Sequence, residues 1–574
     1  MTVTKERPVR RRESPDAAAV AAFSSLDPIL ARLYVTRGIA KEAELDLTLQ
    51  RLVPVRTLDG VDTAVAVLMR SRRRRIIVIG DFDVDGATST ALVVRCLRDF
   101  GFAEVSYLVP NRFEYGYGLT PEIVRVAAAM SPALLLTVDN GISSIEGVAE
   151  ARRLGIDVVI TDHHLPGAEL PAAAAIVNPN LKGSTFGSPN LAGVGVAFYT
   201  MAALGNALQH EGRREAARIP ARYLDLVALG TVADVVRLDQ NNRILVMQGL
   251  RRIRAGSCTA GISALLAVSG RQRERVNSTD LGFAAAPRLN AAGRLDDMSV
   301  GIECLLTDDS ASATRYAEAL DRINHERRDI ETSMRDQAFA FVDRLDQTGL
   351  PGCVCVYDES WHQGVVGLIA SRVKERCHRP VIAFARDQDG QLKGSARSVP
   401  GIHIRDLLEA VCTVRPGLVP RFGGHAMAAG LSLPAAHLED FKVLVCQQLY
   451  RLYPQADFSG ALLSDGDLPA TSMTLRFARV LRDGGPWGAG FPEPLWCGDF
   501  ELVEQRIVGE LHLKLKVRPL DGNARIDAIA FNQASAAFRG SARIAYRLDV
   551  NEWLGVESPQ LVVEQISRLA SPTT

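Results

Sequence analysis

The chain has 574 residues, more than one hydrophobic core usually organises, so we expect about three to four domains. Its 47% apolar and 23% charged residues exclude a disordered, collagen-like or disulfide-scaffold protein. Sixty-six Lys and Arg balance 66 Asp and Glu. A global basic field for polyanions is therefore absent, whereas local basic grooves are compatible with this balance.

The N-terminal segment and the cysteines bear on the cellular compartment. The basic N-terminus has no apolar stretch behind it, and no apolar run reaches the ~18 residues of a membrane span. We therefore expect a cytoplasmic protein without a secretory signal, and a disordered basic tail. The nine cysteines include no C-x-x-C and are expected to be reduced; Cys353 and Cys355 are expected on opposite faces of a strand.

Short β-branched apolar runs alternate with helical stretches in the first part of the chain, which predicts a doubly wound parallel α/β sheet. The expected strands are 76–80, 105–110, 134–139, 157–162 and 174–178. Polar residues stand where these runs stop, and in open parallel sheets ligands bind outside the carboxyl ends of the strands. We therefore expect the functional site at that edge.

The rest of the chain changes pattern three times. Residues 195–270 read as helical, and 307–347 as a long amphipathic connecting helix. A smaller α/β pattern begins at Cys353 and includes two expected glycine-bearing loops, GSARS (394–398) and RFGGHAMAAG (421–430). Alternating runs near the C-terminus predict a small antiparallel barrel. The expected divisions are 1–70 (tail and helical lead-in), 71–235 (first α/β domain), 236–349 (helical extension and connecting helix), 350–455 (smaller α/β domain) and 460–570 (barrel).

The sharpest local signal is DFDVDG (81–86), directly after the first expected strand. Three aspartates at alternate positions cannot all stay ionised and close together unless a cation or hydrogen-bond donors offset their repulsion. Hard oxygen ligands at this density suggest Mg²⁺ or Mn²⁺. A solvated acidic turn and a calcium-type loop are the alternatives for the isolated hexapeptide.

A second signal is Asp162-His163-His164, the only adjacent histidine pair among ten histidines. A single histidine at a strand end is more often a surface or capping residue than a metal ligand. Here two imidazoles share a sheet edge with the aspartates and with Asp139 of TVDNG (137–141). Mixed imidazole and carboxylate ligands suit Mn²⁺, and two ions ~3.5–4 Å apart activate water for in-line attack on phosphorus.

Several motifs in order resemble the DHH phosphoesterase superfamily, and in particular its RecJ single-stranded-DNA exonuclease branch. In the first half they are DFDVDG, PNR (110–112), TVDNG, DHH (162–164), GTVADVV (230–236) and PRLNAAGR (287–294). WHQGVVGLIASR (361–372), GSARS and GGHAMAAG are similar to the DHH-associated domain, and GPWGAGFPEPLW (485–496) is similar to the entry to the oligonucleotide-binding barrel. The resemblance spans roughly residues 70 to 570. It implies that 71–235 is the DHH catalytic domain, 350–455 the DHH-associated substrate-binding domain and 460–570 an OB-type barrel.

The resemblance implies a set of metal ligands. Asp83 and Asp85 would bind metal, Asp139 would bridge two ions, His163 would complete one site and Asp234 the other. Asp81, Asp162 and His164 would support them by orienting ligands or substrate phosphate. In isolation, Asp234 would read as an ordinary helix-end carboxylate.

The resemblance also implies residues that hold the terminal nucleotide against the metals. Arginines offer planar forks to phosphate, and glycines let backbone N–H groups approach an anion. The candidates are Asn111, Arg112, Arg288, Asn290, Arg294, Ser395, Arg397, Ser398, Gly423, Gly424 and His425. Solvated arginines and ordinary turn glycines are the alternatives.

Aromatic residues of the expected barrel could stack bases, although most are expected in its core. These are Trp487, Trp496, Phe500 and Phe531. Phe491 stands where the resemblance leads us to expect Asn, which bears on local barrel geometry and not on the chemistry. The preferred interpretation of the basic run at Arg70 and 72–75 is a solvated edge of the expected sheet. The second interpretation is a surface patch that steers the phosphate backbone of a nucleic acid.

The function that the resemblance implies is a metal-dependent 5′-to-3′ exonuclease that hydrolyses single-stranded DNA to 5′-mononucleotides in recombination and repair. Two Mg²⁺ or Mn²⁺ ions would be cofactors, and single-strand-binding protein and a RecQ-type helicase would be partners. Two alternatives stay open. One is a DHH phosphoesterase of short oligonucleotides or cyclic dinucleotides, and the other is a non-catalytic, Cdc45-like DNA-binding scaffold.

Overall fold

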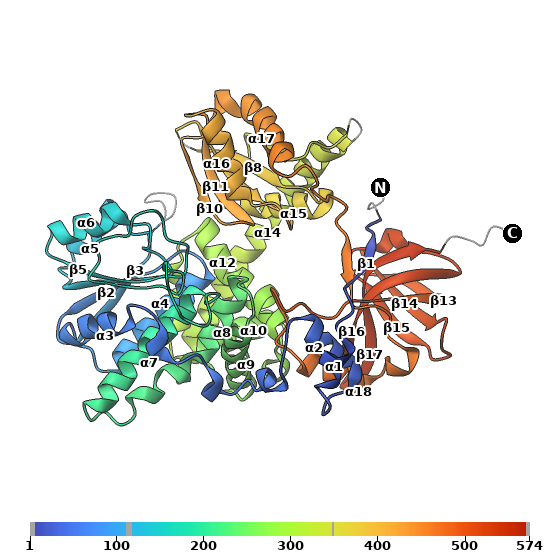
Figure 1. The fold of residues 1–574 in the computed structure, drawn as a ribbon, viewed down its shortest axis with the longest axis horizontal. Coiled ribbons are helices and arrows are strands. Elements are labelled where there is room, and N and C mark those ends of the chain that lie inside the picture. Colours follow the sequence, from blue (N-terminus) through green and yellow to red (C-terminus); the bar gives the residue numbers. More distant parts are fainter. Residues whose placement is uncertain (1–5, 111–117, 347–348, 388, 570–574) are drawn as a thin grey trace.

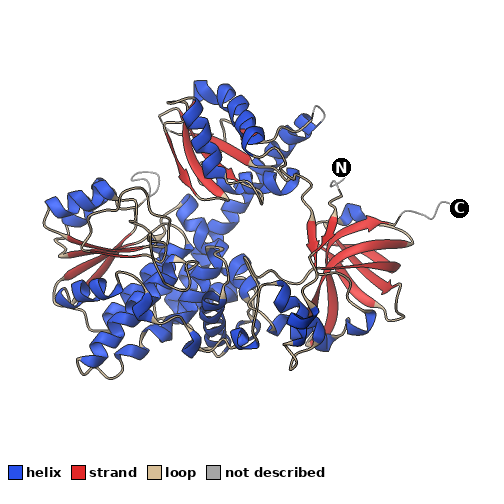
Figure 2. Cartoon of the chain, in the orientation of Figure 1, coloured by secondary structure: helices blue, strands red, loops and turns tan. Residues whose placement is uncertain are grey.

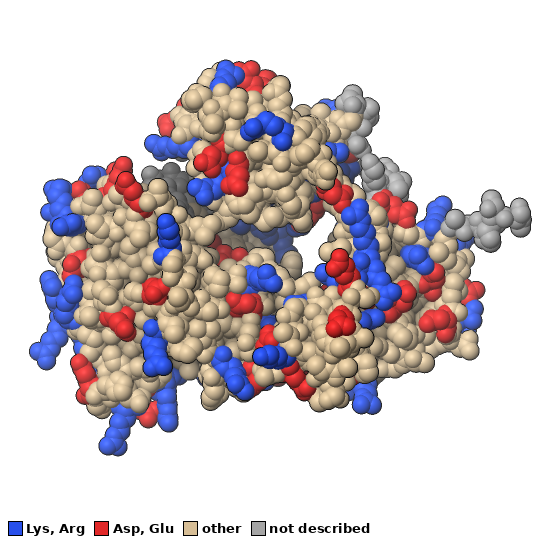
Figure 3. All heavy atoms as spheres, in the orientation of Figure 1, with Lys and Arg blue, Asp and Glu red and all other residues tan. Residues whose placement is uncertain are grey.

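The structure, a computed structural model, describes residues 6–110, 118–346, 349–387 and 389–569. Figure 1 shows a parallel sheet with its helices on the left, a smaller α/β domain at the top and a barrel on the right, around a central group of helices. Strands are confined to these three outer bodies (Figure 2). Figure 3 shows that the molecule is hollowed between the upper domain, the central helices and the barrel, and that acidic and basic side chains intermingle on the visible face.

The first body contains a five-stranded, fully parallel sheet. Its strands are β2 (Arg75–Ile79), β3 (Glu104–Leu108), β4 (Leu134–Val138), β5 (Asp157–Thr161) and β6 (Ala175–Val177). Their order is β3-β2-β4-β5-β6. In β2, β4 and β5 almost every residue is buried, because helices cover both faces, and this explains their continuous apolar runs. The predicted doubly wound parallel sheet is confirmed.

Five helices cover the two faces of this sheet. They are α3 (Val61–Arg70), α4 (Val84–Asp99), α5 (Pro121–Ala128), α6 (Ile145–Arg153) and α7 (Gly193–His210). Ile77 and Leu135 face α5 and α6, whereas Ile76 and Val78 face α3, α4 and α7. Successive side chains of a strand point to opposite faces, so each strand contributes to two cores.

The centre of the molecule is helical. Its helices are α8 (Leu224–Ala233), α9 (Gln240–Arg254), α10 (Ala260–Val268), α11 (Ser278–Asp280), α12 (Ala286–Leu295), α13 (Ser299–Leu306) and α14 (Ser310–Asp346). A π-helical segment, η7 (Leu281–Ala285), leads directly into α12. The 37-residue α14 packs against α10, α12 and α13 and then against the upper domain, which confirms the expected connecting helix.

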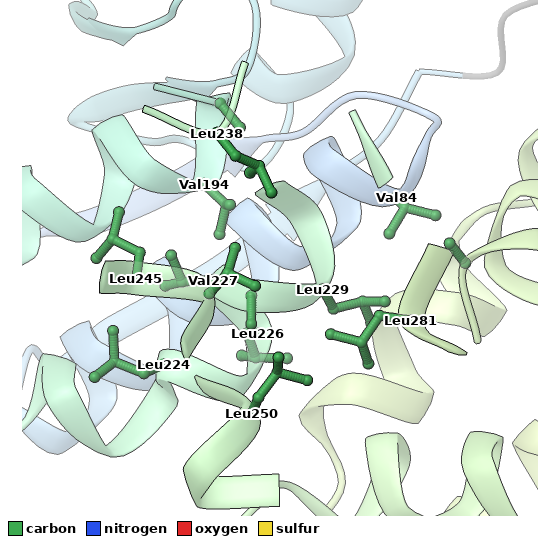
Figure 4. Packing of buried hydrophobic residues seen from close by; sticks show 14 of the residues in the cluster. Val84, Val194, Leu224, Leu226, Val227, Leu229, Leu238, Leu245, Leu250 and Leu281 are labelled. Atoms are coloured by element: carbon green, nitrogen blue, oxygen red, sulfur yellow. The ribbon is translucent and has the colours of Figure 1, made fainter. Parts of the chain in front are cut away.

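A core around α8 holds the beginnings of three elements in place. Val84 at the start of α4, Val194 in the first turn of α7 and Leu281 at the start of η7 lie around Leu226, Val227 and Leu229 of α8 (Figure 4). All six side chains are essentially inaccessible to solvent. Because interiors are close-packed, this core fixes the relative positions of these elements.

The upper domain is a mixed five-stranded sheet between helices. Its elements are β7 (Val354–Tyr357), α15 (Val366–Cys377), β8 (Val381–Arg386), β9 (Gln391–Arg397), α16 (Ile404–Val414), β10 (Arg421–Gly424), β11 (Ala428–Pro434) and α17 (Leu438–Leu452). The order is β10-β11-β9-β8-β7, and only β7 and β8 pair in parallel.

Two expectations for this domain are wrong. GSARS lies largely in β9, and RFGGHAMAAG forms the β10–β11 hairpin, so neither is a loop, because their backbone groups pair across the sheet. Cys353 and Cys355 lie on one face, in the core with α16 and α17, while Val354 and Val356 lie in the core with α15. Residues two apart in a strand share a face.

The C-terminal body is a closed five-stranded barrel. Its strands are β13 (Trp496–Val508), β14 (His512–Pro519), β15 (Ile526–Ala530), β16 (Ser541–Trp553) and β17 (Val556–Arg568), with α18 (Leu475–Asp483) packed against β16 and β17. Closure follows the order β13-β14-β15-β17-β16. The pairing of β15 with β17 is parallel, so the expectation of a purely antiparallel barrel is wrong. Closure requires this pair, because β17 must lie between β15 and its own hairpin partner β16.

The N-terminal segment is part of the barrel side of the molecule. β1 (Val9–Arg11) pairs in parallel with β12 (Leu462–Ser464), which corrects the expected disorder for this part of the tail. The helices α1 (Ala17–Ala21) and α2 (Pro28–Thr36) follow. Just after α2, the buried Arg37 donates to both carboxylate oxygens of Asp465 at 3.0 Å, which ties the N-terminal segment to the barrel entry.

Most barrel-entry aromatics are structural. Trp487, Trp496 and Phe500 are buried, and Phe491 stacks on Trp487 with ring centroids 5.1 Å apart. Phe531 is instead 53% exposed.

Among the described helices, none combines the length and hydropathy that crossing a membrane requires.

Candidate active site

The chemically active side chains follow three neighbouring strands at one edge of the parallel sheet. Asp81, Asp83 and Asp85 follow β2, Asp139 follows β4, and Asp162, His163 and His164 follow β5. Since β2, β4 and β5 are adjacent and parallel, their carboxyl ends meet. Asp234 joins them from the C-terminal end of α8.

The first turn of α4 positions two of the aspartates. Asp83 caps α4, accepting a hydrogen bond from Gly86 N at 3.0 Å, so its carboxylate lies at the positive end of the helix. Asp85 accepts from Gly193 N at 2.6 Å and Val194 N at 2.9 Å, at the start of α7. The carboxylate of Asp85 thus joins two helix starts.

Close packing of carboxylates here depends on a glycine. A Cβ at Gly193 would lie 2.5 Å from Asp139 Oδ1, so only glycine allows this approach. Asp139 itself has φ 62°, a left-handed conformation that is uncommon for residues other than glycine. Strain of this kind often occurs at functional sites, where surrounding structure enforces it.

The imidazole of His163 lies at the centre of the carboxylates. Its Nε2 is 3.2 Å from Asp139 Oδ1, 3.5 Å from Asp234 Oδ2 and 3.9 Å from Asp85 Oδ2. Within the described part of the chain, His163 Nε2 and Asp234 Oδ2 are buried and make no hydrogen bond. Buried polar atoms without hydrogen bonds are costly, and a bound cation would satisfy both.

Three groups of side chains bring ligand atoms within 4.8 Å of one another. They are Asp81, Asp83 and Asp139; Asp85, His163 and Asp234; and Asp139, His163 and His164. The first two groups share no residue, whereas Asp139 belongs to the first and third. A mixed oxygen and imidazole set of this kind fits Mg²⁺ or Mn²⁺.

Burial and mutual repulsion disfavour the charged forms of the carboxylates. Burial, followed by the charge of Asp234, raises the pKa of Asp85 to about 7. Burial and the charge of Asp83 raise the pKa of Asp234 to about 7, and burial and Asp85 raise that of Asp139 well above its usual value. The site is therefore electrostatically strained until a cation offsets the negative charge.

Asp162 orients the two histidines. Its Oδ1 accepts hydrogen bonds from the backbone N of His163 and His164, at 2.7 and 3.0 Å, and lies 2.7 Å from His164 Nδ1. Burial opposes charge on both side chains. Their mutual hydrogen bond outweighs this, so the pKa of Asp162 falls below its usual value and that of His164 rises to about 9. Without a bound metal ion, this favours the protonated form of His164 near neutral pH.

We expect the affinity for Mn²⁺ to rise steeply as pH increases from about 6 to about 8, because ligating carboxyls must lose their protons. The pKa values of about 7 for Asp85 and Asp234 set this window. Calorimetric titration in two buffers of different ionisation enthalpy measures both affinity and proton release. Affinity that stays constant across this range, with no proton release, would contradict the expectation.

A cavity of about 1140 Å³ opens beside these groups, between the first body and the upper domain. Asp83 and Phe82 line it from the metal side, and Asn290 and Arg294 line it from α12. From the upper domain, Ser395, Arg397, Lys393 and Arg421 contribute the polar wall. The cavity is large enough for a nucleotide.

The sheet of the upper domain forms one wall of this cavity. Across the strands, Lys393 pairs with Ser432 and Ser432 with Arg421, while in the next row Ser395 pairs with Gly430 and Gly430 with Gly423. A Cβ at Gly423 or Gly430 would find nothing within 4 Å, so these glycines leave open space beside Ser395 in the second row.

Arg397 is a half-buried cation of the cavity wall. Its Nη1 donates to Ser395 Oγ at 3.0 Å and to Ala396 O at 2.9 Å, and no carboxylate pairs with it among the described residues. Burial lowers the pKa of its guanidinium. A partly buried cation without an anionic partner is costly, so the site is suited to an anion.

The structure places the other predicted substrate residues in three ways. Asn290 Oδ1 accepts from Val84 N at 3.3 Å, and both Asn290 and Arg294 line the cavity. Gly423 and Gly424 lie in the β10–β11 hairpin, and the ring of the next residue, His425, stacks on His164 at 5.3 Å between centroids. Asn111 and Arg112 lie outside the described residues.

Two predicted phosphate contacts are not available to substrate. Arg288 is buried, donates to Ala284 O at 2.6 Å and pairs with Asp321 at 2.8 Å, so it ties α12 to α14. Ser398 is buried and donates to Ile402 O at 2.7 Å, which fixes the turn after β9. In both cases a nearby backbone or carboxylate group already satisfies the side chain.

Sequence reasoning missed Lys393, Arg421 and the amides of Gly193 and Val194. Lys393 was detectable, because Lys393, Ser395 and Arg397 alternate along one strand and so share a face. Arg421 and the α7 amides had no local signal. Their relevance depends on strand pairing and helix packing.

Comparisons with known proteins agree with this arrangement. A family model for the DHH family, N-terminal domain, matches residues 75–231, one for the DHHA1 domain matches 349–451 and one for the RecJ OB domain matches 464–565. The Single-stranded-DNA-specific exonuclease RecJ of Salmonella typhimurium is 50% identical over 574 residues, covering 98% of this chain and 99% of that protein. The protein of that name from Escherichia coli is 50% identical over 570 residues, covering 97% and 98%.

A solved structure gives the same result. The crystal structure of RecJ in complex with Mn²⁺ from Thermus thermophilus aligns with a TM-score of 0.82 and 30% identity. The alignment covers 99% of this chain and 80% of that one. A second structure from that organism, in complex with Mg²⁺, aligns with a TM-score of 0.76 and 29% identity, covering 98% and 79%.

Proposed function

Because this chain belongs to the RecJ family of DHH-domain proteins, we propose that it is a metal-dependent exonuclease specific for single-stranded DNA. We further propose that it proceeds from 5′ to 3′, releases 5′-mononucleotides and acts in recombination and repair. Strand polarity and biological role rest on the family resemblance.

One observation carries the proposal. Two separate groups of potential ligands, Asp81-Asp83-Asp139 and Asp85-His163-Asp234, converge beside a cavity that contains a partly buried arginine without a carboxylate partner among the described residues. A scaffold that had lost its chemistry would have no reason to retain six costly buried or half-buried ligands. The proximity of an anion-binding wall favours a phosphodiester as the substrate.

We assign one cation to each of these groups. Bound there, Mg²⁺ or Mn²⁺ supplies the Lewis acidity that activates water and offsets the charge developing on the scissile phosphate. The two amide donors of α7 hold Asp85 in a fixed orientation, and the cap of α4 does the same for Asp83. Asp162 fixes the backbone of both histidines, so His163 presents Nε2 to the carboxylates.

The cavity residues position the strand end. Arg397 and Ser395 bind a phosphate oxygen, and Asn290 and Arg294 hold the terminal nucleotide from the opposite wall. His164, which Asp162 holds through its Nδ1, contacts phosphate from the metal side. His425 stacks on His164 and so links the upper domain to the metal side, and Gly423 and Gly424 of the β10–β11 hairpin directly precede it.

A long single strand is expected to be hydrolysed at least about tenfold more efficiently than a dinucleotide, because a barrel and an extended track add binding energy that a dinucleotide cannot use. The measurement compares kcat/KM for a long 5′-phosphorylated single strand, the same strand in a blunt duplex and a dinucleotide. Duplex cleavage is expected to be the slowest. Equal or faster turnover of the dinucleotide would favour the small-substrate alternative.

The proposed function also suggests which proteins this nuclease works with and in which cellular compartment it acts. A nuclease that needs single strands requires a helicase to unwind duplex ends, and we propose a RecQ-type helicase and single-strand-binding protein. We propose the cytoplasm as the compartment, in keeping with nine free cysteines.

A further inference from the structure

The cavity wall carries more cationic side chains than a single phosphate requires. Lys393, Ser432 and Arg421 are cross-strand neighbours on β9, β11 and β10, and all three line the cavity. We call these three residues the outer row. Neighbouring strands lie ~4.8 Å apart, so Ser432 stands between the two cations, and both can reach an anion at its hydroxyl group. The chemistry proposed above does not use this row.

The outer row lies farther from the metal ligands than Arg397 does. His425, in the turn between β10 and β11, stacks on His164, so this turn is the end of the sheet nearest to the metal ligands. From the turn outwards, successive pairs across β9 and β11 are Arg397 with Ala428, Ser395 with Gly430, and Lys393 with Ser432. Residues two apart in a strand are separated by roughly 7 Å. The outer row therefore lies one such step beyond Ser395.

The space between Arg397 and the outer row is open. A Cβ at Gly430 or Gly423, which lie in the row of Ser395, would meet nothing within 4 Å. Arg397 is directed towards this row, because its Nη1 donates to Ser395 Oγ at 3.0 Å. A group that continues from a phosphate at Arg397 can therefore extend over the two glycines to the outer row.

The protein engages the cations of the outer row only loosely. Arg421 is exposed, and no carboxylate pairs with it among the described residues. Lys393 Nζ donates to Ser432 Oγ at 3.1 Å and lies 3.4 Å from Asp387 Oδ2. Because 41% of the Lys393 side chain is exposed, water screens this ion pair and keeps it weak. An incoming anion can therefore replace Asp387 as the partner of Lys393.

From this arrangement we propose that the outer row binds the β- and γ-phosphates of a 5′-triphosphorylated strand end. The inference rests on the proposed function, which places the scissile phosphate at the cations and the 5′-terminal nucleotide in the cavity. The 5′ end then points away from the metal ligands, and groups attached to the 5′-terminal phosphate extend past Arg397. Further phosphates are the groups that match two cations and a hydroxyl donor.

Hydrolysis of such an end breaks the same bond as hydrolysis of a monophosphate end. Water attacks the phosphorus between the first and second nucleotides, and the 3′-oxygen of the first nucleotide leaves and takes up a proton. The first product is a nucleoside 5′-triphosphate, the shortened strand carries a 5′-monophosphate, and every later product is a 5′-mononucleotide. Strands that a polymerase starts de novo keep a triphosphate on their first nucleotide. The enzyme therefore degrades them without prior removal of pyrophosphate.

The test compares single strands of one sequence that end in a 5′-triphosphate, a 5′-monophosphate or a 5′-hydroxyl group. For the unmodified protein, KM of the first cleavage is expected to be roughly 10- to 100-fold lower for the triphosphate than for the monophosphate, because hydrogen bonds to charged groups are strong. The combined variant Lys393→Ala and Arg421→Ala should bring this ratio to about one. Arg386→Ala is the matched control, since Arg386 also lines the cavity but pairs with Glu359, and it should keep the ratio.

A variant of opposite effect provides a second check. The carboxylates of Asp387 and Asp389 also line the cavity and oppose the binding of an anion. Asp387 Oδ1 accepts hydrogen bonds from the backbone N of Asp389 and Gln391, at 3.0 and 2.8 Å, and the amide oxygen of asparagine can accept both. Asp387→Asn should therefore keep this turn and lower KM for the triphosphate strand by roughly two- to fivefold.

Calorimetry with nucleotides separates this site from the proposed function. In the same excess of Mg²⁺, dTTP is expected to bind the unmodified protein at least about tenfold more tightly than dTMP, and the combined variant should bind both equally. Equal affinity of the unmodified protein for dTTP and dTMP, or a KM ratio that the combined variant leaves unchanged, overturns the inference. A combined variant that no longer distinguishes 5′-phosphorylated from 5′-hydroxyl strands also overturns it, since the outer row would then hold the terminal monophosphate. If the protein cleaves no strand but prefers dTTP through the outer row, the proposed function fails and the anion site stands.

Discussion

Asp139→Asn is expected to lower kcat on single-stranded DNA by at least about a thousandfold, because bound metal ions contribute several kcal/mol to transition-state stabilisation. Asp139 belongs to two of the three ligand groups, and its Oδ1 is 3.2 Å from His163 Nε2. Asparagine has nearly the same shape but lacks the charge that holds a cation. DNA binding is expected to persist, since the cavity wall and the barrel are unchanged.

The same substitution should not destabilise the metal-free protein. Asparagine tolerates the left-handed backbone that Asp139 adopts, and it removes a buried charge that repels Asp85 and Asp83. Thermal unfolding without metal should therefore occur at the same or a higher temperature than for the unmodified protein. The stabilisation that Mn²⁺ gives the unmodified protein should be largely lost.

Asp225→Asn provides the matched control. Asp225, like Asp139, is a buried carboxylate, but it lies in α8, nine residues before Asp234. It accepts a hydrogen bond from Thr259 N at 2.7 Å. This variant should melt at a lower temperature and keep its kcat. Near-normal turnover by Asp139→Asn would remove Asp139 from the metal centre, and with it the proposed pair of cation sites.

Arg397→Ala is expected to lower kcat/KM by about 30- to 5000-fold, mostly through KM, because truncating a buried partner of a charged hydrogen bond costs ~2–5 kcal/mol. Arg397 is partly buried, is held by Ser395 and Ala396 O, and has no carboxylate partner among the described residues. Arg397→Lys should restore little of the lost kcat/KM, since lysine lacks the planar fork of the guanidinium group.

Two substrates identify which phosphate Arg397 binds. If it holds the terminal 5′-phosphate, Arg397→Ala should abolish the difference in KM between 5′-phosphorylated and 5′-hydroxyl strands. If it holds the scissile phosphate, Arg397→Ala should lower kcat/KM by the same factor for both strands. Arg415→Ala, which breaks an exposed ion pair with Asp440 in the same domain, is the control. An unchanged kcat/KM for Arg397→Ala would contradict an anion site at this wall.

The local sequence pattern was sufficient to predict which side chains meet wherever those side chains directly follow a buried strand. The apolar runs at β2, β4 and β5 predicted a parallel sheet, and a parallel sheet brings the residues after its strands to one edge. The meeting of Asp85, Asp139 and His163 was therefore foreseeable. Asp234 was foreseeable only through its family motif, because an aspartate at the end of a helix is unremarkable by itself.

The local sequence pattern did not predict which arginines contact substrate, because an arginine can pair with a carboxylate of the protein instead. Arg288 and Arg397 both occur in glycine- or alanine-rich motifs, yet Arg288 pairs with Asp321 of α14 while Arg397 faces the cavity. The parallel pairing of β1 with β12 joins segments about 450 residues apart, which no local window can detect.

The sequence by itself determined the class of sheet, the succession of domains and the acidic and imidazole side chains that follow β2, β4 and β5, since these depend on hydrophobic period and on residues adjacent in the chain. Tertiary structure alone decided which cations remain available to substrate and how Gly423 of β10 and Gly430 of β11 leave open space at the cavity wall. These features depend on contacts between distant segments, whose free energies are set by packing and by the partners that folding brings within reach.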